Sequence, residues 1–161
     1  MAIQPADALY QQVVVFDLSN ETYALDITYV IEIIRILPIT PVPGAPYYVE
    51  GLLNLRGRVV AVVDLRKRFG LPLRATGEHS RIIVVQVGDD IVGAIVDAVS
   101  EVVTVSPDVM EPAGRVVTAL DAEFIRGIAK LEGRLVAVLN PDKILEFYGQ
   151  GIEDASFQSV E

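Results

Sequence analysis

The residue types that most often carry out enzyme chemistry are scarce in this sequence. Its 161 residues include a single histidine, His79, and no cysteine. A hydrolytic triad needs a nucleophile beside a positioned base, which is normally a histidine. His79 stands in the polar segment Gly77-Glu78-His79-Ser80, where we expect the imidazole to be solvated. The absence of cysteine excludes disulfides, thiolate nucleophiles and cysteine-ligated zinc. The sequence therefore predicts a protein that is not an enzyme and holds no metal or other cofactor.

Two further patterns could indicate a ligand, and neither is complete. Asp89-Asp90 places two carboxylates in one turn, which offers too few oxygen ligands for calcium. The stretch from Gly51 to Gly57 lacks the Gly-Lys-Ser/Thr sequence of a phosphate-binding loop. The formal net charge is −9, from 13 basic and 22 acidic residues, whereas proteins that bind nucleic-acid backbones are rich in lysine and arginine. We therefore expect no nucleic-acid partner.

Nothing in the sequence indicates insertion into a membrane. No stretch approaches the roughly 20 consecutive apolar residues that span a bilayer. The first residues lack the basic start and apolar core of a signal peptide. We expect a cytoplasmic protein whose surface binds other proteins.

The strongest pattern is an internal repeat. Residues 51–64 read GLLNLRGRVVAVVD, and residues 127–140, which begin 76 positions later, read GIAKLEGRLVAVLN. Each copy is typical of two apolar strands joined by a tight turn, in which Gly57 or Gly133 takes the positive φ. A half of about 70 residues is marginally stable alone, and 52% of the residues are apolar. We therefore expect the two halves to share a hydrophobic seam.

The rest of the chain repeats the same order of elements. Strands are predicted from β-branched and alternating runs between turn signals, at 13–18, 22–26, 30–34, 82–87, 91–96 and 99–103. Short helices are predicted at Leu65–Phe69, capped by Asp64, and at Pro141–Tyr148, capped by Asn140. We expect an all-β fold of two pseudo-symmetric five-stranded barrels, at about 11–75 and 80–150, with a frayed tail at 152–161. Arg66-Lys67-Arg68 is interpreted as a solvated helix face.

The differences between the two copies indicate where function lies. Duplicated units keep the residues that hold the fold and diverge where they meet different partners. Asn54 and Arg56 of the first copy become Lys130 and Glu132 in the second. Arg56 is therefore the candidate for a specific contact, and the alternative is an exposed turn arginine with no role. Glu32, within an apolar strand, either faces solvent or is paired at a sheet edge.

Several of these stretches together resemble the CheW family of chemotaxis coupling proteins. The resemblance rests on Val30-Ile31-Glu32-Ile33-Ile34-Arg35, the proline-rich connection, Gly51-Leu52-Leu53-Asn54-Leu55-Arg56-Gly57-Arg58, Val62-Val63-Asp64-Leu65-Arg66 and Gly93-Ala94-Ile95-Val96-Asp97. It covers roughly residues 11–148. It implies two small barrels of the Src-homology-3 type and a stand-alone adaptor without catalytic activity.

The resemblance also implies partners and site residues. The family's members bind the cytoplasmic tip of a chemoreceptor and the regulatory domain of the histidine kinase CheA. The receptor site corresponds here to Val30, Glu32, Gly51, Asn54, Leu55 and Arg56, and the kinase surface to the second barrel with Gly93 and Val99. Two alternatives remain open: the same adaptor in a pilus-motility or developmental pathway, and a small-molecule-binding barrel, which requires a deep pocket with converging polar groups.

Overall fold

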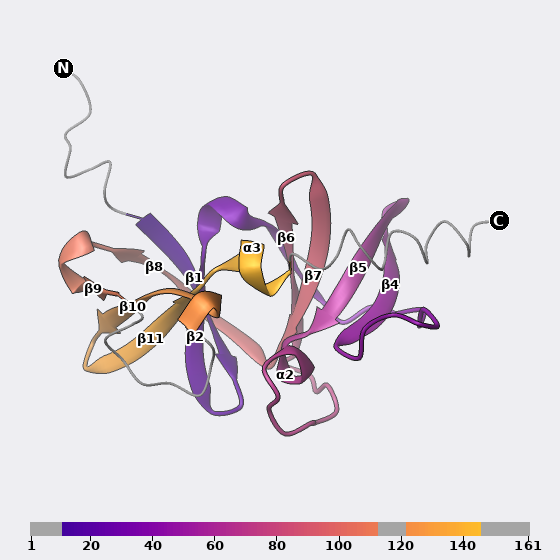
Figure 1. Cartoon of the computed structure of the whole chain (residues 1–161), viewed down its shortest axis with the longest axis horizontal. Coiled ribbons are helices and arrows are strands. Elements are labelled where there is room, and N and C mark those ends of the chain that lie inside the picture. The colour runs from indigo at the N-terminus through magenta and orange to yellow at the C-terminus, as the bar shows by residue number, and fades with distance from the viewer. Residues whose placement is uncertain (1–10, 113–121, 146–161) are drawn as a thin grey trace, which may run out of the picture.

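The computed structural model describes residues 11–112 and 122–145, which form two β-sheets and short helices (Figure 1). Sheet A has the strand order β8 (Ala98–Val105), β1 (Gln11–Leu18), β2 (Glu21–Asp26), β11 (Arg134–Leu139), β10 (Ile125–Leu131) and β9 (Met110–Glu111). Sheet B has the order β3 (Val30–Arg35), β6 (Arg81–Val87), β7 (Asp90–Val96), β5 (Arg58–Asp64) and β4 (Val49–Leu55). The helical segments are η1 (Ile27–Tyr29), α2 (Leu65–Arg68), η2 (Pro107–Val109), η4 (Ala122–Phe124) and α3 (Pro141–Ile144).

This mainly β architecture confirms the fold class predicted from the sequence. Every predicted strand lies within or overlaps an observed one. The helix predicted at Pro141–Tyr148 begins as expected, and its last residues lie outside the described part of the chain, as do residues 1–10 and the tail at 152–161. Asn140 occupies the N-cap position of α3, but its side chain makes no capping hydrogen bond there.

Each sheet takes strands from both copies of the repeat. Hairpin β1–β2 lies in sheet A between β8 and β11, and hairpin β6–β7 lies in sheet B between β3 and β5. The joins are equivalent, because β1 and β6 pair antiparallel with β8 and β3, while β2 and β7 pair parallel with β11 and β5. The two copies have therefore exchanged their first hairpins. The expected ranges of about 11–75 and 80–150 therefore do not correspond to one sheet each. The first hairpin of each range pairs with strands of the other range.

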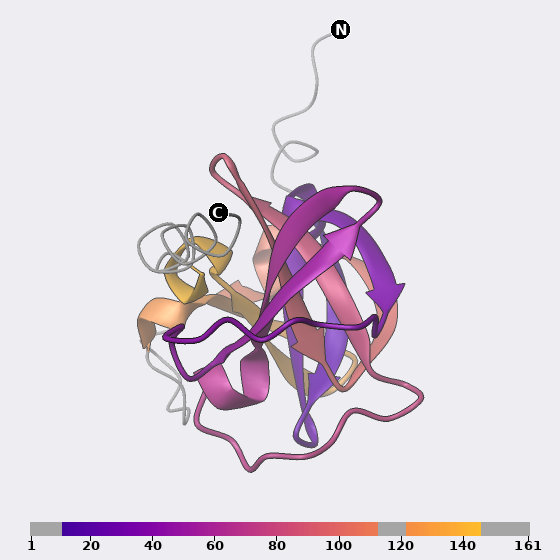
Figure 2. The same cartoon turned by 90° about the vertical axis from the view of Figure 1, so that its right-hand side faces the viewer.

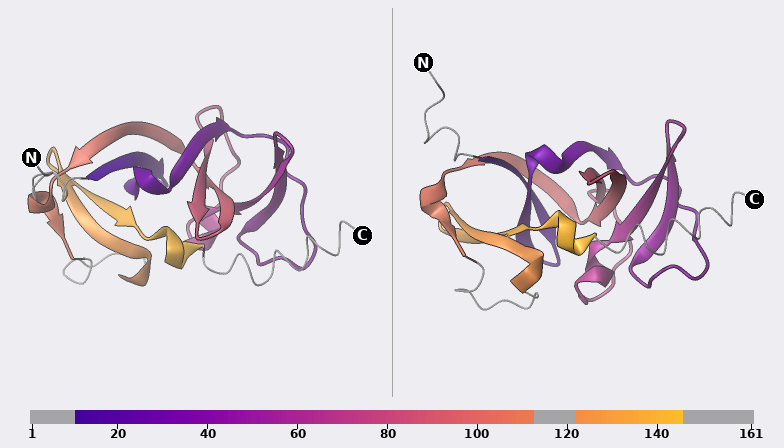
Figure 3. Two further views of the ribbon diagram at one scale, coloured as in Figure 1. Left: turned by 90° about the horizontal axis from the view of Figure 1, so that it is seen from above. Right: turned by 45° about the horizontal axis from the view of Figure 1, so that its top comes forward.

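The exchanged hairpins are buried on both faces and build three apolar clusters. Side chains alternate across a strand, so neighbouring residues of β1 and β6 enter different clusters. Val13 and Val15 pack within sheet A, on its face away from sheet B. Ile82 and Val84 pack on the corresponding face of sheet B. The third cluster lies between the sheets, and it includes Val14, Phe16, Leu18, Tyr23, Leu25, Ala61, Val63, Ile83, Val85, Ala94, Val96 and Leu139. This third cluster is the expected seam between the two sheets, whose ribbons lie side by side in Figure 3.

Among the described residues, direct pairing of edge strands does not close either sheet into a barrel. In sheet B, β3 and β4 are the two edges. The chain leaving β3 reaches β4 only at Thr40, whose N–H and C=O each make a 2.8 Å hydrogen bond with Leu52. Pro38, Pro41 and Pro43 flank that bridge and lack the N–H that a continuing ladder needs. Among the described residues, the two expected barrels are thus seen as two sheets in which closure into a barrel is not detected.

The basic triplet of α2 is not the solvated face that the sequence suggested. Arg66 is buried, and Lys67 makes a 2.9 Å ion pair with Glu50. Arg68 is half-buried and donates from Nε to the carbonyl of Ile144 at 3.0 Å. The interpretation was wrong because α2 lies where the two sheets meet (Figure 1), so each long side chain has protein rather than water beside it.

Arg66 forms the most buried ion pair of the described residues, with Asp97. Its Nε and Nη2 atoms donate to the two carboxylate oxygens at 2.9 and 2.6 Å. The same carboxylate accepts from the amide of Ser19 at 2.8 Å and lies 3.2 Å from Arg74. Burial raises the pKa of Asp97, but the hydrogen bonds from Arg66 and Ser19, together with the nearby positive charges, outweigh it, so the pKa lies below its ordinary value. The pair joins the β1–β2 turn of sheet A to sheet B.

We predict that neither half of the chain folds alone. A fragment of residues 1–76 lacks the strands that flank β1–β2, and a fragment of residues 77–161 lacks those that flank β6–β7. Each fragment alone should show no cooperative thermal transition, and mixing equal amounts should restore one. A single fragment that is monomeric and melts cooperatively would show that the hairpin exchange is not needed for stability.

We predict that Asp97→Asn lowers the free energy of unfolding by about 3 kcal/mol at pH 7, because Arg66 is left buried without its carboxylate. The folded-state pKa of Asp97 is lower than its unfolded value, so the ionised pair stabilises the fold above about pH 4, and this is lost as the pH falls through the folded pKa. Urea unfolding at pH 7 and pH 3 checks both points.

The difference between wild type and Asp97→Asn should shrink at the lower pH. A difference that stays constant would mean that the carboxylate charge is unimportant. Glu101→Gln is the matched control, since it breaks an exposed pair with Arg134 and should cost only about 0–1 kcal/mol.

Candidate functional site

Most of the residues that the sequence singled out lie on the two edge strands of sheet B, β3 and β4, or at the turn that follows β4. Glu32 lies on edge strand β3, and Arg56 lies at the turn of the hairpin β4–β5. The Arg56 guanidinium donates through Nη2 to the Glu32 carboxylate. The pair therefore links the two open edges of the sheet. Figure 2 looks toward this side of the molecule, with the hairpin crossing in front. Of the two possibilities for Glu32, pairing at an edge is the one observed.

The two partners of this pair differ in exposure. The side chain of Arg56 is 69% exposed, whereas that of Glu32 is 29% exposed. Glu32 lies opposite Val84 across the ladder. Both side chains are therefore on the face of sheet B that points away from sheet A, where Ile82 and Val84 pack in an apolar cluster. The carboxylate thus sits at the rim of an apolar cluster and orients a guanidinium that remains open to solvent. Such an arginine can bind a carboxylate or an amide of another protein.

The turn itself fixes where Arg56 points. Arg56 and Gly57 both have positive φ, at 52° and 86°, as a two-residue hairpin turn requires. The side-chain oxygen of Asn54 accepts a hydrogen bond of 2.7 Å from the Gly57 amide. Asn54 therefore stabilises the turn, and its replacement by Lys130 in the second copy removes that acceptor.

Gly51 supports the site from within and does not line it. It is buried, with a φ of 147°. A Cβ atom placed on it would lie 2.1 Å from the carbonyl oxygen of Thr40, far inside contact distance. The close backbone approach that Gly51 permits is thus made by the protein's own proline-rich connection, which holds β4 in place. Leu55 is also buried, and it packs in the same apolar cluster of sheet B as Ile82 and Val84.

Exposed apolar side chains accompany the pair. Ile31 and Ile33 of β3 are 45% and 39% exposed, and Val59 of β5 is 58% exposed. Val30 is half-buried against the seam. A pattern of β-branched residues alone could not have identified the exposed ones, because the same pattern is found on buried faces. Edge strand β3 therefore carries exposed apolar side chains as well as the acid that orients Arg56.

Sheet A carries an equivalent arrangement. Glu101 of β8 corresponds to Glu32 and pairs with Arg134 of β11 at 2.8 Å. Arg134 is the counterpart of Arg58, so the second copy closes the gap with a different arginine of its hairpin. Val102 and Leu135 beside the pair are 50% and 57% exposed. The strands border an open groove of about 490 Å³, whose lining includes Glu101, Val102, Lys130 and Arg134.

The two residues assigned to the kinase surface lie elsewhere. Gly93 is buried in β7 of sheet B, and a Cβ atom there would lie 2.7 Å from the side chain of Ile82. It therefore allows two strands to pack closely and cannot contact a partner. Val99 is half-buried on β8 and packs against the seam. The structure does not bring these two residues together with the groove of sheet A.

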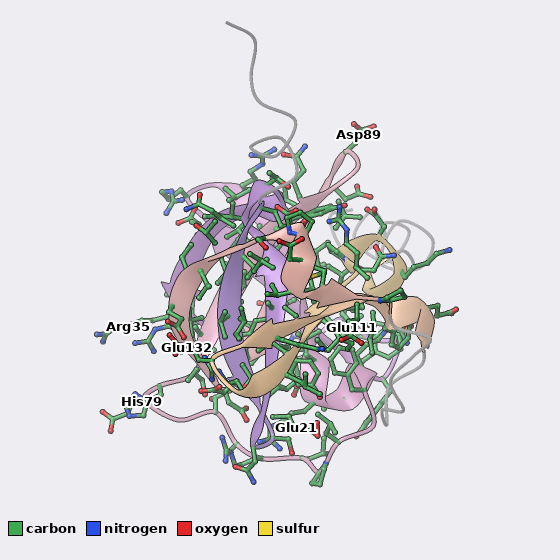
Figure 4. All side chains as sticks on the ribbon, turned by 90° about the vertical axis from the view of Figure 1, so that its left-hand side faces the viewer. Glu21, Arg35, His79, Asp89, Glu111 and Glu132 are labelled. Carbon is green, nitrogen blue, oxygen red and sulfur yellow. The ribbon has the colours of Figure 1, made fainter. Side chains whose placement is uncertain are left out.

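The residues considered for chemistry remain isolated. His79 is exposed in the loop before β6, and Figure 4 shows its side chain pointing away from the body. The part of the chain that the structure describes contains no group of three or more His, Cys, Asp or Glu residues placed to hold a metal ion. Nor does it contain a helix long and apolar enough to cross a membrane.

We predict that Gly51→Ala destabilises the protein by about 2–4 kcal/mol, because the new Cβ would displace the backbone at Thr40 and would impose a strained φ. Thermal and urea unfolding measure the effect. Gly77→Ala is the control, since Gly77 has no atom within 4 Å of the added group and should change stability little. An unaltered melting temperature for Gly51→Ala would mean that the proline-rich connection does not hold β4.

Comparison with known proteins identifies the family. The family model of the CheW-like domain matches residues 12–148. The chain is 35% identical over 136 residues to the chemotaxis protein CheW of Bacillus subtilis, with 84% of this chain and 87% of that protein covered. It is 34% identical over 145 residues to CheW of Thermotoga maritima, which covers 88% and 92% of the two chains.

A solved structure agrees with both. The crystal structure of the scaffolding protein TtCheW from Thermoanaerobacter tengcongensis matches with a TM-score of 0.82 and 35% identity, over 95% of this chain and 99% of that one. The fold, the paired charges at the hairpin and the matches over most of each chain lead to one conclusion. This chain belongs to the CheW family, whose members are non-catalytic adaptors of chemotaxis signalling.

Proposed function

We propose that this protein couples the cytoplasmic tip of a chemoreceptor to the regulatory domain of the histidine kinase CheA, in the cytoplasm at membrane-associated receptor arrays. The observation that carries the receptor site is the Glu32–Arg56 pair, which holds an exposed arginine at a hairpin tip, with Ile31 and Ile33 exposed on the same edge strand as Glu32. A helical receptor tip presents rows of apolar and polar side chains, and this surface has the matching chemistry.

Three kinds of role follow for the receptor-site residues. Arg56 and the exposed parts of Ile31 and Ile33 make contacts, with Val30 at the margin toward the seam. Glu32 and Asn54 orient the arginine through its carboxylate partner and its turn. Gly51 and Leu55 are buried and hold the hairpin against the rest of sheet B.

For the kinase we propose the equivalent end of sheet A. Support comes from the pseudo-symmetry, because Glu101 and Arg134 form an exposed pair with apolar neighbours, as Glu32 and Arg56 do. Two equivalent surfaces at opposite sheets allow one small body to hold two partners at once. Receptor movement then reaches the kinase because the body between the two surfaces is tightly packed.

We predict that Arg56→Asp reduces receptor binding by about 30-fold or more, because an arginine at the centre of an interface can contribute roughly 2 kcal/mol or more. The fold should tolerate the change, because Asp is one of the residues that adopt positive φ readily and the exposed pair contributes only about 0–1 kcal/mol. Pull-down with a receptor fragment, beside a thermal melt, measures both quantities.

Two further variants sharpen this test. Glu132→Arg changes the charge at the equivalent turn position of the β10–β11 hairpin and should leave receptor binding unchanged. The double variant Glu32→Arg/Arg56→Glu keeps an ion pair but places the acid at the hairpin tip. Its stability should therefore match wild type, while receptor binding should stay as weak as in Arg56→Asp. Unaltered binding by Arg56→Asp would move the receptor site away from this hairpin, and rescue by the exchange would mean that Arg56 acts only through Glu32.

A further inference from the structure

Arg68, the last residue of α2, lies between two aromatic rings. Its guanidinium carbon is 4.7 Å from the centre of the Tyr48 ring and 4.7 Å from the centre of the Phe124 ring. Its Nε atom donates to the carbonyl oxygen of Ile144 in α3 at 3.0 Å. A planar guanidinium that stacks on aromatic faces while donating to a carbonyl is held in both position and orientation.

These contacts follow the repeat. Arg68 and Ile144 are 76 positions apart, which is the offset between the two copies, and so are Tyr48 and Phe124. Arg68 therefore touches its own equivalent residue, and its two rings are equivalent to each other. A residue can contact its own equivalent only beside the pseudo-two-fold axis that relates the copies. The side chain of Arg68 marks that axis.

Each ring stands at the base of one partner-binding hairpin. Tyr48 precedes β4, and its carbonyl accepts a 2.8 Å hydrogen bond from the amide of Asp64 at the end of β5. Phe124 precedes β10, and its carbonyl accepts an equivalent 2.8 Å bond from Asn140 after β11. Arg68 thus joins the base of the β4–β5 hairpin in sheet B to the base of the β10–β11 hairpin in sheet A.

The residue at the axis also differs in chemistry between the two copies. One copy supplies an arginine, and the other supplies the buried isoleucine Ile144. An aliphatic side chain at position 68 could fill space between the rings, but it would neither stack as a plane nor donate to α3. The seam consists of apolar contacts, which have no preferred direction. Such contacts stabilise burial of the two faces but do not by themselves select one angle between the sheets.

We propose that Arg68 is a positioning residue that fixes the angle between the two hairpins, and so aligns the two bound partners with each other. The alignment of partners rests on the function proposed above, whereas the fixed angle does not. The contacts of Arg68 described above are with Tyr48, Phe124 and Ile144, none of which belongs to either proposed binding surface. Its loss should therefore disturb communication between the partners and leave the binding of each one intact.

A distance measurement tests the angle directly. The natural chain has no cysteine, so Val59→Cys and Leu135→Cys introduce two unique labelling sites at equivalent, exposed positions of β5 and β11. Pulsed electron spin resonance between spin labels at these sites should give one narrow distance distribution. Adding Arg68→Leu should broaden or shift it. An identical distribution would overturn the inference, because the seam would then suffice.

Lys67→Leu is the matched control for that measurement. Lys67 lies on the same helix and also carries a cation over a ring, 5.0 Å from the centre of Tyr47, and pairs with Glu50. All of these contacts lie within one copy of the repeat, so the distribution should not change. An equal broadening in both variants would mean that α2 as a whole, and not Arg68, holds the angle. Should Arg68→Leu not fold, Arg68→Lys replaces it, with the same expected and opposing results.

A second arm separates alignment from binding. Without labels, Arg68→Leu should bind a receptor fragment and a CheA fragment separately within about twofold of wild type, while receptor-dependent kinase activation falls by about tenfold, a typical size for coupling between sites. Equal losses in binding and activation would overturn the positioning role. A wild-type protein that binds neither fragment would contradict the proposed function, while the distance measurement would still decide the role of Arg68.

Discussion

The reciprocal exchange of hairpins β1–β2 and β6–β7 is the constraint on which the rest of this structure depends. Each exchanged hairpin is buried on both faces, so one face completes its adopted sheet while the other forms the seam. The Arg66–Asp97 pair then links the turn of one exchanged hairpin to the opposite sheet. Because no contiguous half contains a complete sheet, we expect the two copies to fold together. A half of about 70 residues would be marginal alone, whereas the shared seam gives both copies one larger core.

This arrangement leaves the edges of the sheets available for recognition. The central strands are occupied on both faces, whereas β3 and β8 have one exposed side and an acid that reaches a hairpin arginine. Such ionic contacts are weak when exposed, so they contribute little to stability. They orient side chains at the rim of each sheet instead. Substitutions of these exposed pairs should therefore leave the folded body intact.

Duplication explains both the similarity and the difference of the two rims. The backbone of each hairpin is the same, with a non-glycine residue and a glycine at positive φ in the turn. The arginine that meets the edge acid has moved by two positions between the copies, from Arg56 to the equivalent of Arg58. At the pseudo-two-fold axis a cation replaces an aliphatic residue. A body that is symmetric in its backbone is thus asymmetric in the chemistry of its surfaces and of its centre.

The sequence by itself determined the strands, the repeated hairpin, the turn at Arg56-Gly57 and the family, because these depend on local periodicity, on turn chemistry and on motifs contiguous in the chain. It also singled out Glu32 and Arg56, each as a candidate for a specific contact, whereas their pairing is seen only in the structure. Only the tertiary structure decided that the copies exchange hairpins, that Arg66 finds Asp97, and that Gly51 and Gly93 are buried supports. The physical reason is that these outcomes depend on which distant strands become neighbours. Local patterns of apolar residues are compatible with several such pairings, and packing selects one.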